Sequence, residues 1–205
     1  MKAAVLTHYD KKGTELDIRE ISTPTPEEDE VLVKIMTAGV NPLDNMIIRG
    51  EVKLIVPYET PLVMGNEFAG VVKKTGKNVA GFKPGDRVYG GMPLKKIGTF
   101  AEYAAVKETA LAVIPEYLSF EEAATVPLTA LTAMQAFEVM DVHAGESVFI
   151  SGGTGSLGAM AIPVAKSLGL HVYTNGSGDN EERVRKVGGG KIHRLQERKL
   201  CGCSL

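Results

Sequence analysis

The chain has 205 residues, 44% of them hydrophobic, so it is long enough to bury the core of one large domain or two small ones. Its net charge is −2 and its Lys and Arg residues are scattered, which argues against a nucleic-acid partner and favours a small-molecule ligand. No signal-peptide pattern and no apolar run of membrane-spanning length is present, so we expect a cytoplasmic protein without a membrane partner.

The first hundred residues alternate short β-branched runs with Gly, Pro, Asn and Asp, which is typical of an all-β unit with many turns. Val31, Val33 and Ile35 occupy alternate positions, so one face of that strand is expected to be buried. The expected strands cover residues 2–7, 16–21, 30–39, 67–74, 86–89 and 99–106.

A helix is expected from Ser119, because Ser119 and Glu122 form a capping-box pattern ahead of apolar residues at helical spacing. Pro127 lies within this helix and is expected to kink or split it. The chain continues with a short apolar strand (147–151), a Gly-rich turn, an apolar stretch (157–168) and another strand (171–174). Strands that alternate with helices predict a parallel sheet.

The Gly-rich turn has the pattern G-x-G-x-x-G and lies between a predicted strand and a predicted helix. It consists of Gly153, Thr154, Gly155, Ser156, Leu157 and Gly158. In this context glycines allow a tight turn, a close approach of the backbone to a pyrophosphate and close helix–strand packing. We therefore predict that these six residues bind a dinucleotide, and a purely structural turn is the alternative.

Two other motifs do not fit this turn. A phosphate-binding P-loop ends in Gly-Lys-Ser/Thr, but Ala159 follows Gly158. A nucleophile elbow has Gly two positions before its Ser, but Thr154 stands two positions before Ser156. Neither a triphosphate site nor a serine hydrolase is predicted.

The second strand of the β-α-β unit lacks the acidic residue that binds the ribose hydroxyls in NAD-selective folds. The first carboxylate after this strand is Asp179. A 2′-phosphate is therefore tolerated, with Asn175 and Ser177 as hydrogen-bond donors and Arg183 as added positive charge. We predict NADP(H) as the cofactor, and ordinary loop roles for these three residues are the alternative.

Four segments resemble the medium-chain dehydrogenase/reductases in order and spacing, and the resemblance covers residues 1 to about 188. They are Ala-Gly-Val-Asn-Pro-Leu-Asp (38–44), Gly-Asn-Glu-Phe-Ala-Gly (65–70), Phe-Lys-Pro-Gly-Asp-Arg-Val (82–88) and Leu-Thr-Ala-Leu-Thr-Ala (128–133). The resemblance implies an α/β protein. A GroES-like β-barrel catalytic domain is expected over residues 1–122, and the first part of a Rossmann NADP-binding domain over residues 123–188.

Zinc alcohol dehydrogenases of the same superfamily have a Cys in the segment that matches 39–44, and a His where this chain has Asn66. Here the first of these positions is Asn41, and the two cysteines, Cys201 and Cys203, lie at the end of the chain. The four histidines show no paired ligand spacing. No metal site is therefore expected, and the pattern resembles zinc-independent quinone oxidoreductases and enone reductases.

The resemblance implies NADPH-dependent reduction of a quinone or an α,β-unsaturated carbonyl by hydride transfer, with hydrogen-bond donors stabilising the oxygen that gains charge. The candidate catalytic residues are Asn41, which would polarise the carbonyl, and Asp44, for which a helix-cap or turn role is the alternative. Thr129 is expected to bind the cofactor near its nicotinamide ring, or alternatively to bond its own helix backbone. A family tyrosine is replaced by Met46, so solvent is a candidate proton source, and Glu67 is expected to be a structural remnant.

A 2-enoyl thioester reductase is a close alternative that the sequence does not separate from these reductases. The alternative from another class is a non-catalytic truncated pseudo-enzyme or a nucleotide-binding module. Family members are often dimers, so the resemblance allows a homodimer for a full-length protein.

Residues 189–205 depart from the family pattern. Read one base out of register, this segment can encode a continuation typical of such a reductase, so our hypothesis is an out-of-frame tail after Gly188. We then expect the parallel sheet to stop after its second strand, with an open edge. Little or no turnover is expected from the 205-residue chain.

Overall fold

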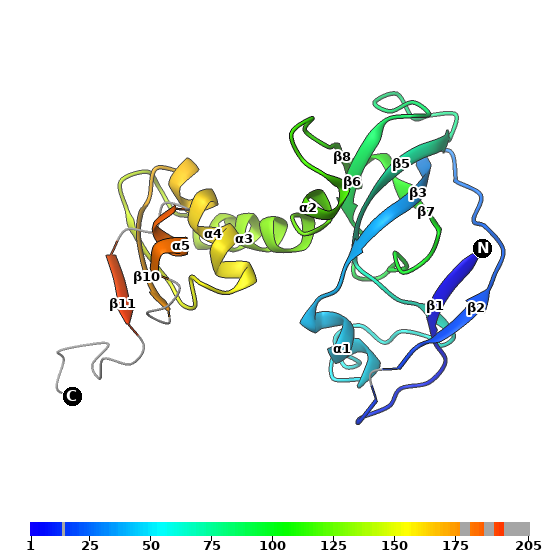
Figure 1. The fold of residues 1–205 in the computed structure, drawn as a ribbon, viewed down its shortest axis with the longest axis horizontal. Coiled ribbons are helices and arrows are strands. Elements are labelled where there is room, and N and C mark those ends of the chain that lie inside the picture. The colour runs from blue at the N-terminus through cyan, green and yellow to red at the C-terminus, as the bar shows by residue number, and fades with distance from the viewer. Residues whose placement is uncertain (14, 177–180, 187–190, 195–205) are drawn as a thin grey trace. The chain divides into compact units, whose positions relative to one another are not determined.

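The computed structural model describes residues 1–13, 15–176, 181–186 and 191–194, and for residues 181, 183, 185 and 191–194 it describes the backbone only (Figure 1). The chain divides into two compact units, Met1–Leu128 and Thr129–Leu205. The domain boundary between residues 122 and 123 stays a prediction. Among the described residues, no helix has both the length and the apolar character that a membrane crossing requires.

The first unit contains a five-stranded antiparallel sheet of order β7-β3-β5-β6-β8 and a three-stranded sheet of order β2-β1-β4. Its elements are β1 (Lys2–Leu6), β2 (Asp17–Glu20), β3 (Glu30–Gly39), β4 (Leu62–Val63), β5 (Glu67–Thr75), β6 (Arg87–Gly91), β7 (Tyr103–Lys107), the 3-10 helix η1 (Glu108–Ala110) and β8 (Leu111–Val113). The predicted strands are present: β3 has the predicted bounds, and the others have shifted ends. Strands β4 and β8 are additions, because runs of two and three residues carry no readable periodicity.

The core of the larger sheet forms around β3, whose Val31 and Val33 are fully buried. Ile35 is partly buried against the same cluster, which also contains Phe68 from β5, so the predicted apolar alternation on β3 is confirmed. The pairing of β3 with β5 sets Gly39 directly opposite Glu67. The chain leaving β3 therefore meets the start of β5 at one end of this sheet.

A short helix, α1 (Pro42–Ile48), follows β3. This helix is not predicted from the sequence, which offers a helix cap or turn at Asp44 as the alternative to a catalytic role. Ile47 and Ile48 are buried and pack in a cluster with Met64. This packing fixes the helix against the first unit, although the segment is too short to show a helical pattern in the sequence.

The predicted helix from Ser119 is split into α2 (Phe120–Ala124) and α3 (Pro127–Met140). Ser119 caps α2: Glu122 N donates to Ser119 Oγ at 3.1 Å, and Ser119 N donates to Glu122 Oε2 at 2.9 Å. Pro127 begins α3, where its missing N–H needs no partner. Both the capping box and the split at the proline are confirmed.

The second unit contains a parallel sheet of order β11-β10-β9, which confirms the predicted alternation of strands and helices (Figure 1). Its elements after α3 are β9 (Ser147–Ile150), α4 (Ser156–Ser167), β10 (His171–Gly176), α5 (Glu181–Lys186) and β11 (Lys191–Arg194). Phe137 from α3, Val148 from β9, Ile162 from α4 and Val172 from β10 are buried in one cluster. The sheet thus carries its own apolar core.

The expectation that the parallel sheet stops after its second strand is wrong. Strand β11 pairs with β10 from Tyr173↔Lys191 to Gly176↔Arg194. The main-chain hydrogen bonds of a parallel ladder do not depend on side-chain identity, so a departure from the family pattern does not prevent the pairing. Residues 187–190 and 195–205 lie outside the described residues, and the out-of-frame tail stays a prediction.

Candidate functional site

Asn41 and Asp44 meet at the start of α1. Asn41 is the N-cap of this helix, and its backbone N–H donates to Asp44 Oδ2 at 2.7 Å. Pro42 occupies the next position, where the helix needs no N–H donor. Asp44 thus has the helix-cap role that is the alternative to catalysis, and its catalytic role stays a prediction.

Asp44 is also the acceptor of a buried side-chain hydrogen bond. Asn66 Nδ2 donates to Asp44 Oδ1 at 2.8 Å, and both residues are almost completely buried. Burial raises the pKa of the Asp44 carboxyl above its ordinary value, while the hydrogen bonds from Asn41 and Asn66 act to lower it. Asp44 therefore holds the α1 cap and the start of β5 together.

Glu67 forms a second contact of the same kind. Its side chain is buried, with Oε1 accepting from Asn41 Nδ2 at 2.7 Å and Oε2 accepting from Leu128 N at 2.8 Å. Gly39 lies opposite on β3, and a Cβ at that position would fall well inside van der Waals contact with Glu67 Oε1. Glu67 therefore joins the Asn41 loop to the first turn of α3, and its expected role as a structural remnant stays a prediction.

The Asn41 amide keeps one donor for a bound molecule. A side-chain amide nitrogen carries two N–H donors, and Glu67 takes up one of them. Asn41 is half-buried, so its amide is held in place without being sealed inside the protein. This arrangement can present an oriented N–H to an oxygen on which negative charge develops.

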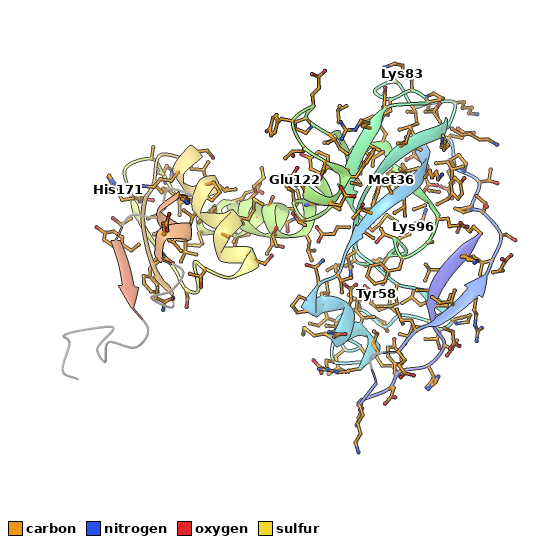
Figure 2. All side chains as sticks on the ribbon, in the orientation of Figure 1. Met36, Tyr58, Lys83, Lys96, Glu122 and His171 are labelled. Carbon is orange, nitrogen blue, oxygen red and sulfur yellow. The ribbon has the colours of Figure 1, made fainter. Side chains whose placement is uncertain are left out.

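Met46 and Tyr58, on and near α1, are the side chains to consider as a source of the substrate's proton. Met46 stands where the resemblance implies a tyrosine, and it is 39% exposed. Tyr58, labelled in Figure 2, packs with Ile47 of α1 and donates its hydroxyl to the carbonyl oxygen of Leu94. Burial raises the pKa of Tyr58. The Tyr58 hydroxyl already donates its proton to the main chain, so it does not replace the family tyrosine as a proton donor. Solvent as the proton source stays a prediction.

The residues at the zinc positions do not fit a zinc ion. Asn41 and Asn66 point their amide nitrogens at carboxylates as donors, whereas zinc requires thiolate, imidazole or carboxylate ligands. Over the part of the chain that the structure describes, no group of three or more His, Cys, Asp or Glu side chains is arranged to hold a metal ion.

The six residues predicted to bind a dinucleotide lie in the turn between β9 and α4 and the first turn of α4. Gly155 is the N-cap of α4 and its N–H donates to Gly152 O at 2.9 Å. A Cβ on Gly158 would lie 2.7 Å from Gly153 Cα, so this glycine allows α4 to pack closely on the turn. Among the described residues, a Cβ on Gly155 would meet only Gly152 O, at 3.3 Å, which leaves room for a ligand to approach. The positive end of α4 at this turn suits a phosphate.

Asn175 at the end of β10 holds this turn in place. Its Oδ1 accepts from Gly152 N at 2.6 Å and its backbone carbonyl accepts from Gly153 N at 3.0 Å. Asn175 is 5% exposed, so only its amide nitrogen is left for the predicted 2′-phosphate contact. Ser177 lies outside the described residues, and Arg183 lies in α5 with its side chain outside the description.

The predicted residues therefore form two groups. Asn41 and Asp44 are joined through one capping box, and the Gly turn is joined to Asn175. Thr129 is buried in the first turn of α3, next to Leu128, whose N–H is bound by Glu67. Its cofactor role stays a prediction.

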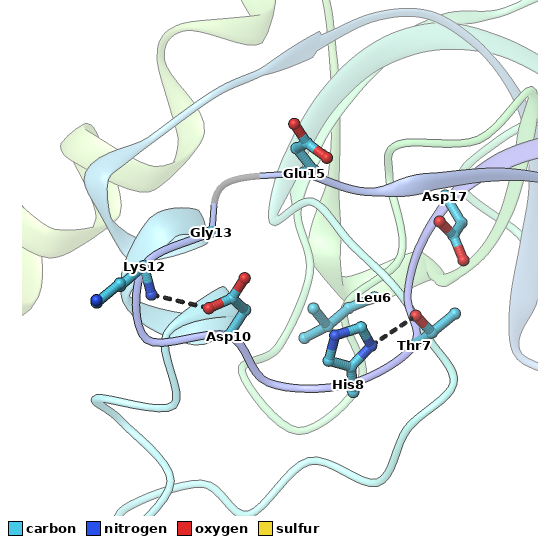
Figure 3. A pocket seen from close by; sticks show the side chains of 8 residues that line it. All are labelled: Leu6, Thr7, His8, Asp10, Lys12, Gly13, Glu15 and Asp17. Atoms are coloured by element: carbon cyan, nitrogen blue, oxygen red, sulfur yellow. Dashed lines mark hydrogen bonds between the residues drawn. The ribbon is translucent and has the colours of Figure 1, made fainter.

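A polar cavity in the first unit shares no residue with either group (Figure 3). It is lined by Leu6, Thr7, His8, Asp10, Lys12, Gly13, Glu15 and Asp17. Lys12 N donates to Asp10 Oδ1 at 2.9 Å, and Thr7 Oγ1 lies 3.1 Å from His8 Nδ1. These contacts join near neighbours in the chain and stabilise the loop after β1.

Comparison with known proteins identifies relatives over most of the chain. Residues 27–116 match the Alcohol dehydrogenase GroES-like domain family. The chain is 33% identical over 182 residues to a quinone oxidoreductase of Homo sapiens, covering 87% of this chain and 54% of that protein. It is 34% identical over 200 residues to the NADPH-dependent alkenal/one oxidoreductase, chloroplastic, of Arabidopsis thaliana, covering 92% of this chain and 50% of that protein. The chain thus spans about half the length of the curated relatives it matches.

A solved structure gives the same result for the fold. An alcohol dehydrogenase superfamily protein from Novosphingobium aromaticivorans superposes with a TM-score of 0.86 at 32% identity, covering 95% of this chain and 58% of that one. The GroES-like match and this likeness agree with the two units and their sheets. The chain belongs to the medium-chain dehydrogenase/reductase family, with a GroES-like domain followed by the first part of a Rossmann domain.

Proposed function

We propose that the chain is part of an NADPH-dependent oxidoreductase that reduces a quinone or an α,β-unsaturated carbonyl by hydride transfer without zinc. The observation that carries the proposal is the amide of Asn41, which Glu67 orients while one N–H donor stays available. Bound NADPH would supply the hydride. The names of the human and Arabidopsis relatives support this substrate class.

Asn41 acts on the oxygen of the substrate. When a conjugated carbonyl or quinone accepts a hydride, negative charge develops on its oxygen, and a donor already in position stabilises that charge. Asp44 acts through Asn41, because its carboxylate fixes the α1 cap at the Asn41 backbone N–H. In this proposal Asn41 contacts the substrate and Asp44 positions it.

The Gly turn binds the diphosphate of the cofactor. The space at Gly155 and the first N–H groups of α4 favour a phosphate at this point. NADPH is favoured over NADH because β10 ends in Thr174, Asn175 and Gly176 without a carboxylate. Ser177 and Arg183 remain candidate contacts of the 2′-phosphate.

The zinc-independent part of the proposal follows from the donor chemistry of Asn41 and Asn66. Both amides donate to buried carboxylates, so these carboxylates have hydrogen-bond partners without a cation. The polarising group is then an N–H donor. A cytoplasmic location and a homodimer stay predictions.

A titration with NADPH and with NADH, followed by fluorescence, tests cofactor binding. NADPH oxidation with a panel of quinones and enones tests turnover, which we expect to be slow for the 205-residue chain. Tighter binding of NADPH than of NADH, with turnover, supports the proposal. Binding without any turnover supports a nucleotide-binding module or pseudo-enzyme instead, and no binding contradicts both.

A further inference from the structure

Glu67 connects two elements that are far apart in the sequence. Asn41 lies 26 positions before it and Leu128 lies 61 positions after it, yet both donate to its carboxylate at 2.7 and 2.8 Å. The backbone of Glu67 is fixed as well, because its carbonyl accepts from Thr99 Oγ1 at 3.1 Å. The carboxylate is therefore held from several sides.

The chemistry of this contact requires a carboxylate. Two N–H donors face Glu67, and an ionised carboxylate has an acceptor oxygen for each. A glutamine has one acceptor oxygen and one donor nitrogen. Since the main-chain N–H of Leu128 cannot be reversed, a glutamine would give its oxygen to Leu128 and its nitrogen to Asn41. The Asn41 amide would then have to turn over to present its oxygen.

The surrounding structure makes room for this carboxylate. Gly39 lies opposite Glu67 in the β3–β5 ladder, and any side chain at that position would collide with Glu67 Oε1. The glycine and the glutamate therefore act as a complementary pair. Their position at the end of β3 places the carboxylate next to Asn41, two residues further along the chain.

We propose that Glu67 is a positioning residue: its carboxylate fixes which way the Asn41 amide faces and ties that amide to the first turn of α3. The inference rests on the proposed function, in which Asn41 donates to the substrate oxygen. Glu67 does not touch the substrate. It acts by keeping the free N–H of Asn41 in one orientation.

NMR of the chain labelled with 15N and 13C tests the orientation directly. The side-chain amide signals of Asn41 are assigned by their loss in Asn41→Ala. In the unaltered chain, couplings across the hydrogen bonds are expected from Asn41 Nδ2 and Leu128 N to the carboxyl carbon of Glu67. Glu67→Gln is expected to move the bonded amide proton of Asn41 upfield. The same variant is expected to lower turnover by up to roughly 100-fold, the loss that follows removal of a preorganised donor. Its affinity for NADPH should stay unchanged.

Glu30→Gln is the matched control. Glu30 is as deeply buried in the same unit, but its partners are Lys96 and the N–H of Glu27. This variant is expected to lose stability while the Asn41 signals and turnover stay as they are. If both glutamine variants move the Asn41 signals equally, the inference is overturned, because the effect is then a general loss of structure.

Gly39→Ala gives a second test if Glu67→Gln does not fold. The added methyl group pushes the carboxylate away without changing any donor or acceptor, so the Asn41 signals should move in the same direction. Absence of both couplings in the unaltered chain overturns the inference without any variant. Failure of the proposed function would appear differently, as absence of turnover in the unaltered chain with any quinone or enone.

Discussion

Asp44 provides a quantitative test of the buried polar contacts. Asp44→Ala removes the acceptor of two hydrogen bonds and leaves Asn41 N and Asn66 Nδ2 without it. Hydrogen bonds to a charged group contribute about 1.5–3 kcal/mol each, and removing the buried carboxylate recovers part of its desolvation cost. We expect the first unit to lose about 3 kcal/mol of unfolding free energy.

Asp44→Asn is expected to cost less, about 1–2 kcal/mol, because Asn66 can turn its amide over. Its Oδ1, which has no partner among the described residues, would then accept from the new amide nitrogen, and Asn41 N would keep an acceptor oxygen. The ranking of the two variants tests this geometry. A smaller loss for Asp44→Ala than for Asp44→Asn would refute it.

The pH dependence follows from the raised pKa of Asp44. The folded protein binds this proton more tightly than the unfolded chain, whose pKa is near 3.8. The extra stability is therefore fully present below pH 3.8 and is lost as the pH rises through the folded pKa. Asp44→Asn has no proton to bind at this position and lacks this extra stability. The difference in unfolding free energy between it and the unaltered chain should therefore grow as the pH falls from the folded pKa towards 3.8.

Urea unfolding followed by tyrosine fluorescence measures these changes, because every tyrosine except Tyr173 lies in the first unit. Asp17→Asn serves as the control, since Asp17 forms an exposed ion pair with Arg19 at 3.0 Å and should change stability by less than about 1 kcal/mol. The reasoning would be refuted if Asp44→Ala lost less than about 1 kcal/mol of unfolding free energy. It would also be refuted if the loss for Asp44→Asn did not change with pH.

Four further substitutions test other parts of the chain separately. Asn41→Ala should lower kcat by about 100- to 1,000-fold with NADPH affinity unchanged, measured by NADPH oxidation, and an unchanged kcat would remove Asn41 from the mechanism. Gly158→Ala should destabilise the second unit by about 1–3 kcal/mol, because the new Cβ meets the main chain of the Gly turn. Gly155→Ala should fold normally and weaken NADPH binding. Circular-dichroism melting measures the first effect and fluorescence titration the second. Ser119→Ala should cost about 1 kcal/mol by loss of the α2 cap in urea unfolding, and no loss would contradict the capping box.

The fold is predictable from the sequence where a pattern is local. The alternation on β3, the capping box at Ser119 and the strand–turn–helix around Gly153 all lie within short stretches, and each is present. Helix α1 and strands β4 and β8 are too short to carry a period, so long-range packing decides them. Strand β11 is not predicted, because the side-chain sequence there departs from the family pattern. It forms nevertheless, because its pairing with β10 uses main-chain hydrogen bonds.

The candidate site divides in the same way. The Gly turn is a contiguous motif, so its place between β9 and α4 follows from the sequence. The role of Glu67 does not follow, because both of its partners come from distant parts of the chain. A signal was nevertheless present: Glu67 opens a strand whose next five residues (68–72) are apolar, and a charged residue at such a position requires buried partners.

Asn41 and Asn66, at the family's zinc positions, each donate to a buried carboxylate, and the two carboxylates are bound in one repeated arrangement. Asp44 accepts from the side-chain amide of Asn66 and from a main-chain N–H, and Glu67 accepts from the side-chain amide of Asn41 and from a main-chain N–H. Each carboxylate thus accepts from two N–H donors and has hydrogen-bond partners without a cation. A divalent ion would have to displace donors whose nitrogens cannot bind it. In the proposed function, the contact with Glu67 leaves Asn41 one N–H for the substrate oxygen, and that donor is what a reduction without a metal would require.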